Sequence, residues 1–141
     1  MSANPNKKIY VLFTCLDWRL HPKIEQYFTR NGDGCDCCVT AGSIQGLLDD
    51  ATQNLFLKQI EISKNLHHCA GVILTMHLDC GAYGGSKNFV TEAAETAHHA
   101  AELERATTVI SGRSPGLAVE RYIVGLRRDG AGWAIEPKRI A

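Results

Sequence analysis

Two short segments of the chain are almost continuously apolar and rich in β-branched and aromatic residues. They are residues 8–14, with the sequence KIYVLFT, and residues 71–76, with the sequence GVILTM. Apolar runs of this length without alternation are typical of strands buried on both faces of a parallel sheet. A further run over residues 37–41 predicts a shorter strand that ends at Gly42.

Three other segments have the residue spacing or composition of helices. The first starts near Pro22, a residue favoured in the first helical turn, and ends at turn-forming residues 31–34. The second is expected over about residues 49–66, and the third, rich in Ala and Glu, over about residues 88–107. The apolar positions at helical spacing are Ile24, Tyr27 and Phe28 in the first and Ala51, Leu55 and Ile62 in the second.

The C-terminal part predicts a hairpin, because residues 117–126 and 133–136 flank the turn sequence Asp129-Gly130-Ala131-Gly132. A polar turn over residues 111–116 is expected before it. Strands that alternate with helices predict a three-layer α/β fold: a mostly parallel sheet flanked by helices, with an antiparallel C-terminal edge strand. The 141 residues contain no repeat or linker, so a single domain over residues 1–141 is expected.

The amino-acid composition of the chain indicates which class of ligand it binds. Hydrophobic residues make up 45% and charged residues 21%, which excludes a disordered chain. Fifteen Lys and Arg residues balance fifteen Asp and Glu residues, and no basic run is present. The chain therefore lacks the positive surface typical of proteins that bind nucleic acid or anionic membranes, and a small-molecule ligand is expected.

The N-terminal residues indicate the compartment. The first apolar run, residues 9–13, is too short for the core of a signal peptide, and no run approaches the roughly 18 apolar residues of a membrane helix. We therefore expect a cytoplasmic protein. Cysteines remain reduced there, so the six cysteines are expected to bind metal or act in catalysis rather than form disulfides.

Residues that can bind a metal ion or act in catalysis directly follow the two predicted buried strands. Cys15, Asp17 and Arg19 follow the first, and His77 and Cys80 follow the second. Ligands of parallel sheets bind at the carboxyl ends of strands, so neighbouring strands would bring both segments into one crevice. Two thiolates and one imidazole form a three-ligand zinc set with one open position, the pattern of a catalytic site. If the chain stays extended after Cys15, Asp17 and Arg19 lie on the same face beside the metal.

Each of these residues also has a purely structural interpretation. A buried cysteine at a strand end is often only a small hydrophobic residue, and a single histidine often only makes hydrogen bonds. Asp17 and Arg19 could form an ion pair without a catalytic part. The occurrence of both segments at the ends of two predicted parallel strands favours the metal site.

Together, these segments resemble the signature of the β-class carbonic anhydrases. The matching motifs are Cys15-x-Asp17-x-Arg19 and His77-x-x-Cys80-Gly81. The resemblance extends through the order of elements to the final hairpin, and the length is that of short members. It implies that Cys15, His77 and Cys80 are zinc ligands and that Asp17 and Arg19 form a regulatory and catalytic pair. It also implies a homodimer or higher homo-oligomer with the active-site cleft at the subunit interface.

The reaction implied by this resemblance is the reversible hydration of carbon dioxide to bicarbonate by zinc-bound hydroxide. Zinc lowers the pKa of bound water from about 15.7 toward about 7. Two thiolates offset the charge of the ion, so activity at mildly alkaline pH is expected. Asp17 would accept a hydrogen bond from the hydroxide, and Arg19 would hold the Asp17 carboxylate by a charge-assisted contact.

Other functions are compatible with the same residues. A similar zinc site can hydrolyse carbon disulfide or carbonyl sulfide. A non-catalytic zinc scaffold or sensor is a further alternative, because Val39-Thr40 stands where the resembled family commonly has Arg-Asn before Ala41-Gly42. A thiol redox protein would use Cys37 and Cys38 without a metal.

The remaining candidates are interpreted structurally. Strand alternation points Cys37 and Cys38 to opposite faces, which favours packing of the Cys35/Cys37/Cys38 cluster over shared ligation. The pairs His67-His68 and His98-His99 diverge by about 100° on a helix, so solvated or capping histidines are expected. Asp79 is either an acceptor behind a metal ligand or a turn residue. The remaining expectations are a packed Cys69 and a loop over residues 84–86.

Overall fold

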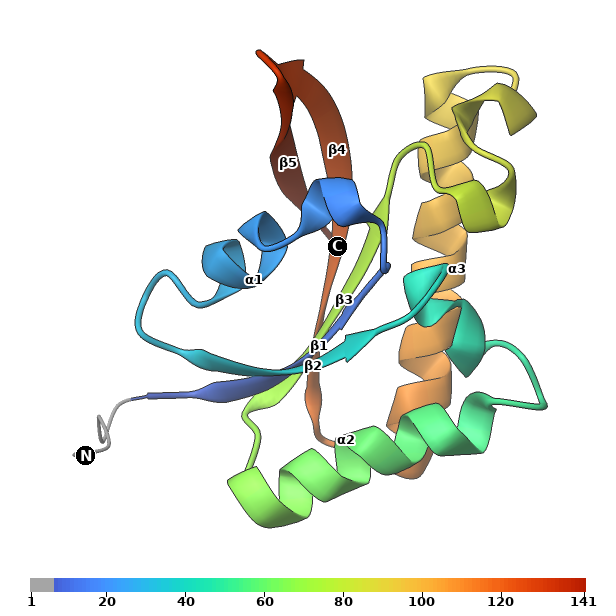
Figure 1. Cartoon of the computed structure of the whole chain (residues 1–141). Helices are drawn as coiled ribbons and strands as arrows, with labels where there is room; N and C mark the ends of the chain where they lie inside the picture. Colours follow the sequence, from blue (N-terminus) through green and yellow to red (C-terminus); the bar gives the residue numbers. More distant parts are fainter. Residues whose placement is uncertain (1–6) are drawn as a thin grey trace.

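The computed structural model describes residues 7–141 and consists of a five-stranded sheet between two layers of helices (Figure 1). The N-terminal residues 1–6, considered above for a leader sequence, lie outside this range. The strands are β1 (Ile9–Thr14), β2 (Gly34–Val39), β3 (Gly71–His77), β4 (Ala118–Asp129) and β5 (Gly132–Ile140). The α-helices are α1 (Lys23–Phe28), α2 (Gln53–His67) and α3 (Glu92–Arg113).

The sheet has the strand order β2-β1-β3-β4-β5. The first four of these pair in parallel, whereas β5 returns antiparallel to β4 through a hairpin at the predicted turn sequence, where Asp129 pairs with Gly132. This arrangement confirms the α/β class with an antiparallel C-terminal edge. Because β1 and β3 are direct neighbours, their carboxyl ends lie side by side, as the site prediction requires.

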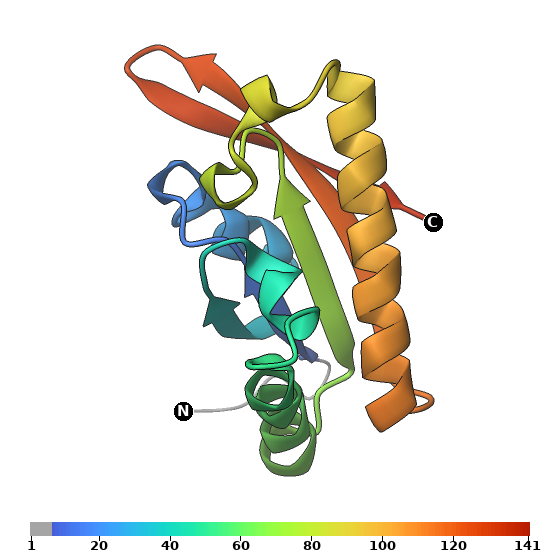
Figure 2. The same cartoon turned by 90° about the vertical axis from the view of Figure 1, so that its right-hand side faces the viewer.

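Each face of the sheet has its own apolar core, because successive side chains of a strand point to opposite faces. On one face Phe13 of β1 packs in a cluster with Leu57 of α2 and Leu103 of α3. On the other face Leu12 packs in a cluster with Ile24 of α1. Figure 2 shows α3 running alongside β3 and β4. Burial on both faces explains the continuous apolar runs in the sequence of β1 and β3.

Several predicted boundaries were wrong. β2 begins at Gly34 rather than residue 37 and ends at Val39 rather than residue 41. α3 begins at Glu92, because the side chain of Thr91 caps it by accepting a hydrogen bond from the Ala94 amide at 3.0 Å. The helix continues to Arg113, so residues 111–113, expected in a polar turn, are helical. Ile110, near the C-terminal end of α3, is buried in the apolar core, and this burial favours the longer helix.

The apolar residues whose spacing predicted α2 are not the residues that this helix buries. Leu55 is 58% exposed and Ile62 is 43% exposed, and Ala51 precedes the helix. The helix instead buries Leu57 and Ile60 against the sheet. In the part of the chain from residue 7 onward, no helix is both long and apolar enough to cross a membrane.

Candidate metal centre

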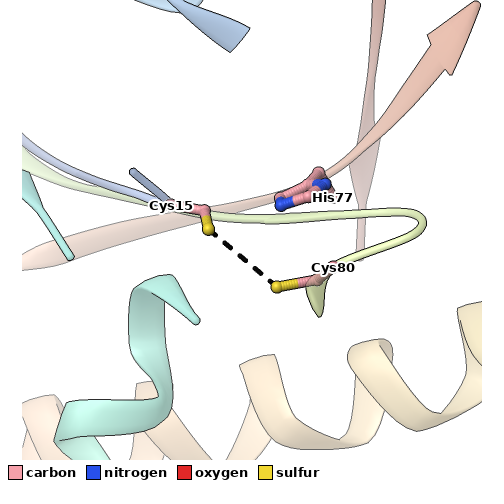
Figure 3. Close-up of side chains that lie close together, drawn as sticks. All are labelled: Cys15, His77 and Cys80. Carbon is pink, nitrogen blue, oxygen red and sulfur yellow. Dashed lines mark hydrogen bonds between the residues drawn. The ribbon is translucent and has the colours of Figure 1, made fainter. Parts of the chain in front are cut away.

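Cys15, His77 and Cys80 converge at the carboxyl ends of β1 and β3 (Figure 3). One ligand atom of each residue lies within 4.8 Å of the others, and the two sulfur atoms are 3.9 Å apart. All three side chains are buried. The predicted grouping is therefore confirmed, with one detail changed: His77 is the last residue of β3 rather than a residue of the following loop.

Hydrogen bonds of the backbone hold the two ligand segments in place. The carbonyl oxygen of Cys80 accepts from the amides of Tyr83 and Gly85, at 3.0 and 2.9 Å, which closes the loop after β3. The carbonyl oxygen of Cys15 accepts from Nε2 of His21 at 2.8 Å. These contacts fix the backbone positions of Cys15 and Cys80.

The imidazole of His77 has one nitrogen free for a ligand. Its Nδ1 donates to the carbonyl oxygen of Leu78 at 2.8 Å, so in the neutral imidazole Nε2 is the nitrogen with a lone pair available for a metal ion. Within residues 7–141, this buried Nε2 has no hydrogen-bond partner. An unsatisfied buried acceptor is unfavourable, and a metal ion between the sulfurs and Nε2 would satisfy it.

The two thiols of the cluster lie within hydrogen-bonding distance of each other, at 3.9 Å between the sulfur atoms. The hydrogen bond with Cys80 lowers the pKa of Cys15 to about 3, and the same contact raises the pKa of Cys80. A metal cation between the two sulfur atoms would stabilise both residues as thiolates. Two sulfurs and one imidazole nitrogen suit a tetrahedral zinc ion with a fourth position left for a small ligand.

Asp17 and Arg19 form the predicted pair, although the local backbone differs from the expectation. The chain does not stay extended after Cys15, because Asp17 caps a 3₁₀ turn over Trp18–Leu20. Nη2 of Arg19 donates to Oδ2 of Asp17 at 2.7 Å, and Nε donates to Oδ1 at 3.1 Å. These hydrogen bonds lower the pKa of Asp17. The Oδ2 atom lies 3.9 Å from Nε2 of His77, so an ionised carboxylate lies beside the three ligands.

A cavity of about 490 Å³ adjoins the cluster. Asp17 and Arg19 are the charged residues of its wall, and the rest of the lining is apolar apart from the Cys15 thiol. These other lining residues are Leu16, Trp18, Ala41, Gly42, Gly81 and Ala82. Val39 and Thr40 are outside this lining, and the Thr40 hydroxyl donates to the Ser43 carbonyl oxygen at 3.2 Å. Small uncharged molecules fit such a cavity.

Comparison with known sequences agrees with this geometry. The sequence profile of a family described as "Putative carbonic anhydrase" matches residues 5–131. The chain belongs to this family. The match confirms the resemblance inferred from the motifs of the carbonic anhydrases.

Two similar proteins occur in Rickettsia. "Uncharacterized protein RC0076" of Rickettsia conorii is 30% identical over 129 residues, which cover 86% of this chain and 69% of the relative. An "Uncharacterized protein" of Rickettsia bellii is 26% identical over 129 residues, covering 86% of this chain and 79% of the relative. The similarity thus extends well beyond the two motifs that contain Cys15, His77 and Cys80.

Two further carboxylates lie near the candidate site, Asp79 in the loop between His77 and Cys80 and Glu95 on α3. Asp79 has a left-handed backbone with φ of 60°, and it accepts hydrogen bonds from Arg19 rather than from a metal ligand. Glu95 of α3 is buried and accepts from the Asp79 amide at 2.7 Å. Sequence analysis missed Glu95, although it lies on one helical stripe with the buried His99 and Leu103.

The cysteines of β2 lie outside the metal centre. Their side chains alternate as predicted: Cys38 packs against the core, whereas Cys37 is exposed. Burial raises the pKa of Cys35 to about 12 and that of Cys38 to about 11, and it also raises the pKa of Cys37. These groups therefore remain thiols at neutral pH, which disfavours the redox alternative. Cys69 is buried in the core, as expected.

The histidine pairs were predicted correctly except for His99. His67 and His98 are exposed, and His68 ends α2 in a left-handed conformation. His99 is fully buried instead of solvated, and its ring packs edge-on against Tyr83 with 5.1 Å between centroids. Its position on the inner stripe of α3 explains the difference.

Burial of His99 should make the protein less stable in mild acid. Burial lowers the pKa of His99 from 6.5 to about 4. Between these values the unfolded chain binds a proton that the folded chain does not, so the free energy of unfolding falls as pH decreases. The contribution is at most about 1.4 kcal/mol per pH unit. In urea denaturation at several pH values from about 7 to about 4.5, His99→Leu should have the shallower slope.

The exposed neighbour His98 supplies the control. His98→Leu should keep the pH slope of the natural sequence, because the His98 side chain stays exposed to water in the folded protein. Equal slopes for His99→Leu and the natural protein would contradict a neutral buried His99.

Proposed function

We propose that this protein is a zinc-dependent carbonic anhydrase that interconverts carbon dioxide and bicarbonate. The observation that carries the proposal is the convergence of two thiols and an unpartnered imidazole nitrogen beside the Asp17–Arg19 pair. Family membership supports the same reaction.

The donor set supports zinc as the metal. Thiolates favour softer cations than magnesium or calcium, and two sulfurs with one nitrogen fit tetrahedral zinc. When bound, zinc supplies a hydroxide nucleophile at neutral pH by lowering the pKa of water toward about 7.

Asp17 orients the nucleophile in this proposal. Its ionised carboxylate can only accept hydrogen bonds, and Oδ2 lies within 3.9 Å of the ligand nitrogen of His77. A protonated oxygen nucleophile would therefore donate its hydrogen to Asp17 and turn a lone pair toward the substrate. Arg19 keeps the carboxylate in this orientation through its paired donors.

The cavity supports a small, uncharged substrate. Leu16, Trp18 and Ala82 are among its apolar lining residues, and an apolar wall suits linear carbon dioxide. The same lining also suits carbonyl sulfide or carbon disulfide as a second candidate substrate, because these molecules are likewise small, linear and uncharged. Asp17 and Arg19 would orient the nucleophile in the same way for either class of substrate.

Stopped-flow hydration of carbon dioxide by metal-analysed protein tests the proposal. We expect about one zinc ion per chain and a turnover that chelation abolishes and added zinc restores. The same preparation is assayed for sulfide release from carbonyl sulfide. If zinc-loaded protein releases sulfide but does not hydrate carbon dioxide, carbonyl sulfide becomes the proposed substrate in place of carbon dioxide. A zinc-loaded protein inactive in both assays would favour the scaffold alternative.

We also propose that the protein forms a homodimer or a higher homo-oligomer. Trp18 is 73% exposed and Leu16 is 58% exposed at the cavity, and the edge strand β2 has unpaired backbone groups. A second copy would cover such surfaces. Sedimentation at micromolar concentration should give at least about twice 15.4 kDa. Trp18→Ala should weaken association more than Leu66→Ala on α2, and a monomer of the natural protein would contradict this proposal.

A further inference from the structure

A continuous set of hydrogen bonds links the interior of the protein to the Asp17–Arg19 pair. It begins at Glu95 on α3, which is only 1% exposed. The two carboxylate oxygens of Glu95 accept from the amide of Asp79 at 2.7 Å and from the hydroxyl of Ser86 at 2.8 Å. Glu95 thereby fixes the loop that carries Asp79 between the ligands His77 and Cys80.

Hydrogen bonds to both the side chain and the backbone amide of Asp79 fix its position. Its Oδ1 accepts from the amide of Ser86 at 2.9 Å, and its own amide is held by Glu95. The remaining acceptors of Asp79 are turned to Arg19. Oδ2 accepts from Nη1 of Arg19 at 3.1 Å, and the carbonyl oxygen accepts from Nη2 at 3.0 Å.

The guanidinium of Arg19 is therefore held independently of Asp17. Nη1 and Nη2 contact Asp79, the ring of Trp133 lies 5.0 Å from the guanidinium carbon, and Nε and Nη2 hold the Asp17 carboxylate. Without Asp79, the position of Arg19 would depend much more on Asp17 itself. A mobile Arg19 competes less well for the carboxylate than a fixed one, because ordering it costs conformational entropy.

Asp17 has an alternative partner close by. Its Oδ2 is 3.9 Å from Nε2 of His77, so a small movement would bring the carboxylate to the fourth position of a metal held by the cluster. The balance between Arg19 and the metal thus decides whether the fourth position is open.

We propose that Glu95 and Asp79 are positioning residues that fix Arg19 and thereby keep Asp17 away from the fourth metal position. This inference rests on the metal site of the proposed function, but it does not depend on which substrate is turned over. Neither residue touches the substrate; both act through Arg19.

Two conservative variants test the inference. Asp79→Asn keeps the size of the side chain and tolerates the left-handed backbone, but it removes the charged acceptor of Arg19. Glu95→Gln keeps one acceptor and replaces the other by a donor, so it loosens the loop from the opposite end. Glu92→Gln is the matched control, because Glu92 is an exposed residue of the first turn of the same helix.

The readout is access to the fourth metal position in Co²⁺-substituted protein. Azide is titrated and followed by the visible absorption bands of Co²⁺. Both variants should bind about one Co²⁺ per chain, and their azide affinity should fall about tenfold, an ordinary coupling between groups of one hydrogen-bond network. Their azide-free spectra should shift toward that of Arg19→Ala, whereas Glu92→Gln should match the natural protein.

A double variant separates positioning from a general effect on the loop. If Asp79 acts through Asp17, Asp79→Asn should not change azide affinity further in an Asp17→Asn background. Equal losses in both backgrounds would overturn the inference, as would unchanged azide affinity in both single variants. If Asp79→Asn fails to fold, Glu95→Gln carries the same test. Natural protein that binds azide as expected but hydrates no carbon dioxide would refute the proposed function and leave this inference supported.

Discussion

Cys80→Ser is expected to lose most of the bound metal and, with it, the activity. A serine hydroxyl stays neutral at pH 7, so the variant offers one thiolate where the natural cluster offers two sulfurs 3.9 Å apart. We expect the zinc affinity to fall by at least about 100-fold, since losing a ligand should cost more than losing a residue behind one. Chelator competition followed by metal analysis measures the change.

A second buried cysteine provides the control for this experiment. Cys69 is also a free, buried thiol, but it lies in the core and not in the cluster. Cys69→Ser should therefore lose some stability while keeping its zinc. Full zinc retention by Cys80→Ser, or equal loss in both variants, would contradict the assignment of Cys80 as a ligand.

The grouping of Cys15, His77 and Cys80 was predictable because its sequence signals are local to two strand ends. The apolar runs of β1 and β3 identify buried parallel strands, and the parallel arrangement determines that their carboxyl ends meet at one edge. The contact between Cys15 and His77, distant in sequence, follows once these strands are neighbours. The hairpin of β4 and β5 was predictable for a similar reason, since its turn residues carry a local signal.

The exposed and buried sides of the helices were less predictable. Leu55 and Ile62 have helical spacing, yet α2 packs through Leu57 and Ile60, because the direction from which a helix meets the sheet is a tertiary property. The burial of His99 has the same origin: the stripe of α3 that meets the sheet includes polar residues. Sequence spacing alone cannot distinguish such a stripe from a solvated one.

The contacts around Arg19 also depend on tertiary structure. The sequence indicated the pair with Asp17, two residues away, but the 3₁₀ turn that wraps Arg19 around it was not predicted. Asp79 was considered only as an acceptor behind a ligand or as a turn residue. Its contacts with Arg19 and Glu95 join residues from three segments of the chain. Contacts between distant segments cannot be predicted from a local sequence pattern.

Arg19→Ala should keep its zinc and lose most of its turnover. The ligands Cys15, His77 and Cys80 are untouched, so metal content should stay at about one ion per chain. Without the guanidinium, Asp17 is free to occupy the fourth position. We expect turnover to fall by roughly 10²–10⁴-fold, the usual range for a positioned acid–base group. The loss should be larger at pH 6 than at pH 9, because hydroxide competes with the carboxylate better at high pH.

Asp17→Asn should also keep its zinc, but it should lose turnover for a different reason. Its amide cannot close the metal site as a carboxylate can, yet its NH₂ group can donate to the nucleophile instead of accepting from it. We again expect a roughly 10²–10⁴-fold loss of turnover. Since Arg19 lowers the pKa of Asp17, the natural carboxylate is ionised throughout pH 6–9, and changes of rate in this range do not report its protonation. The loss in Asp17→Asn should therefore vary less with pH than the loss in Arg19→Ala. Unchanged turnover from pH 6 to 9 in either variant would reduce the pair to a structural ion pair.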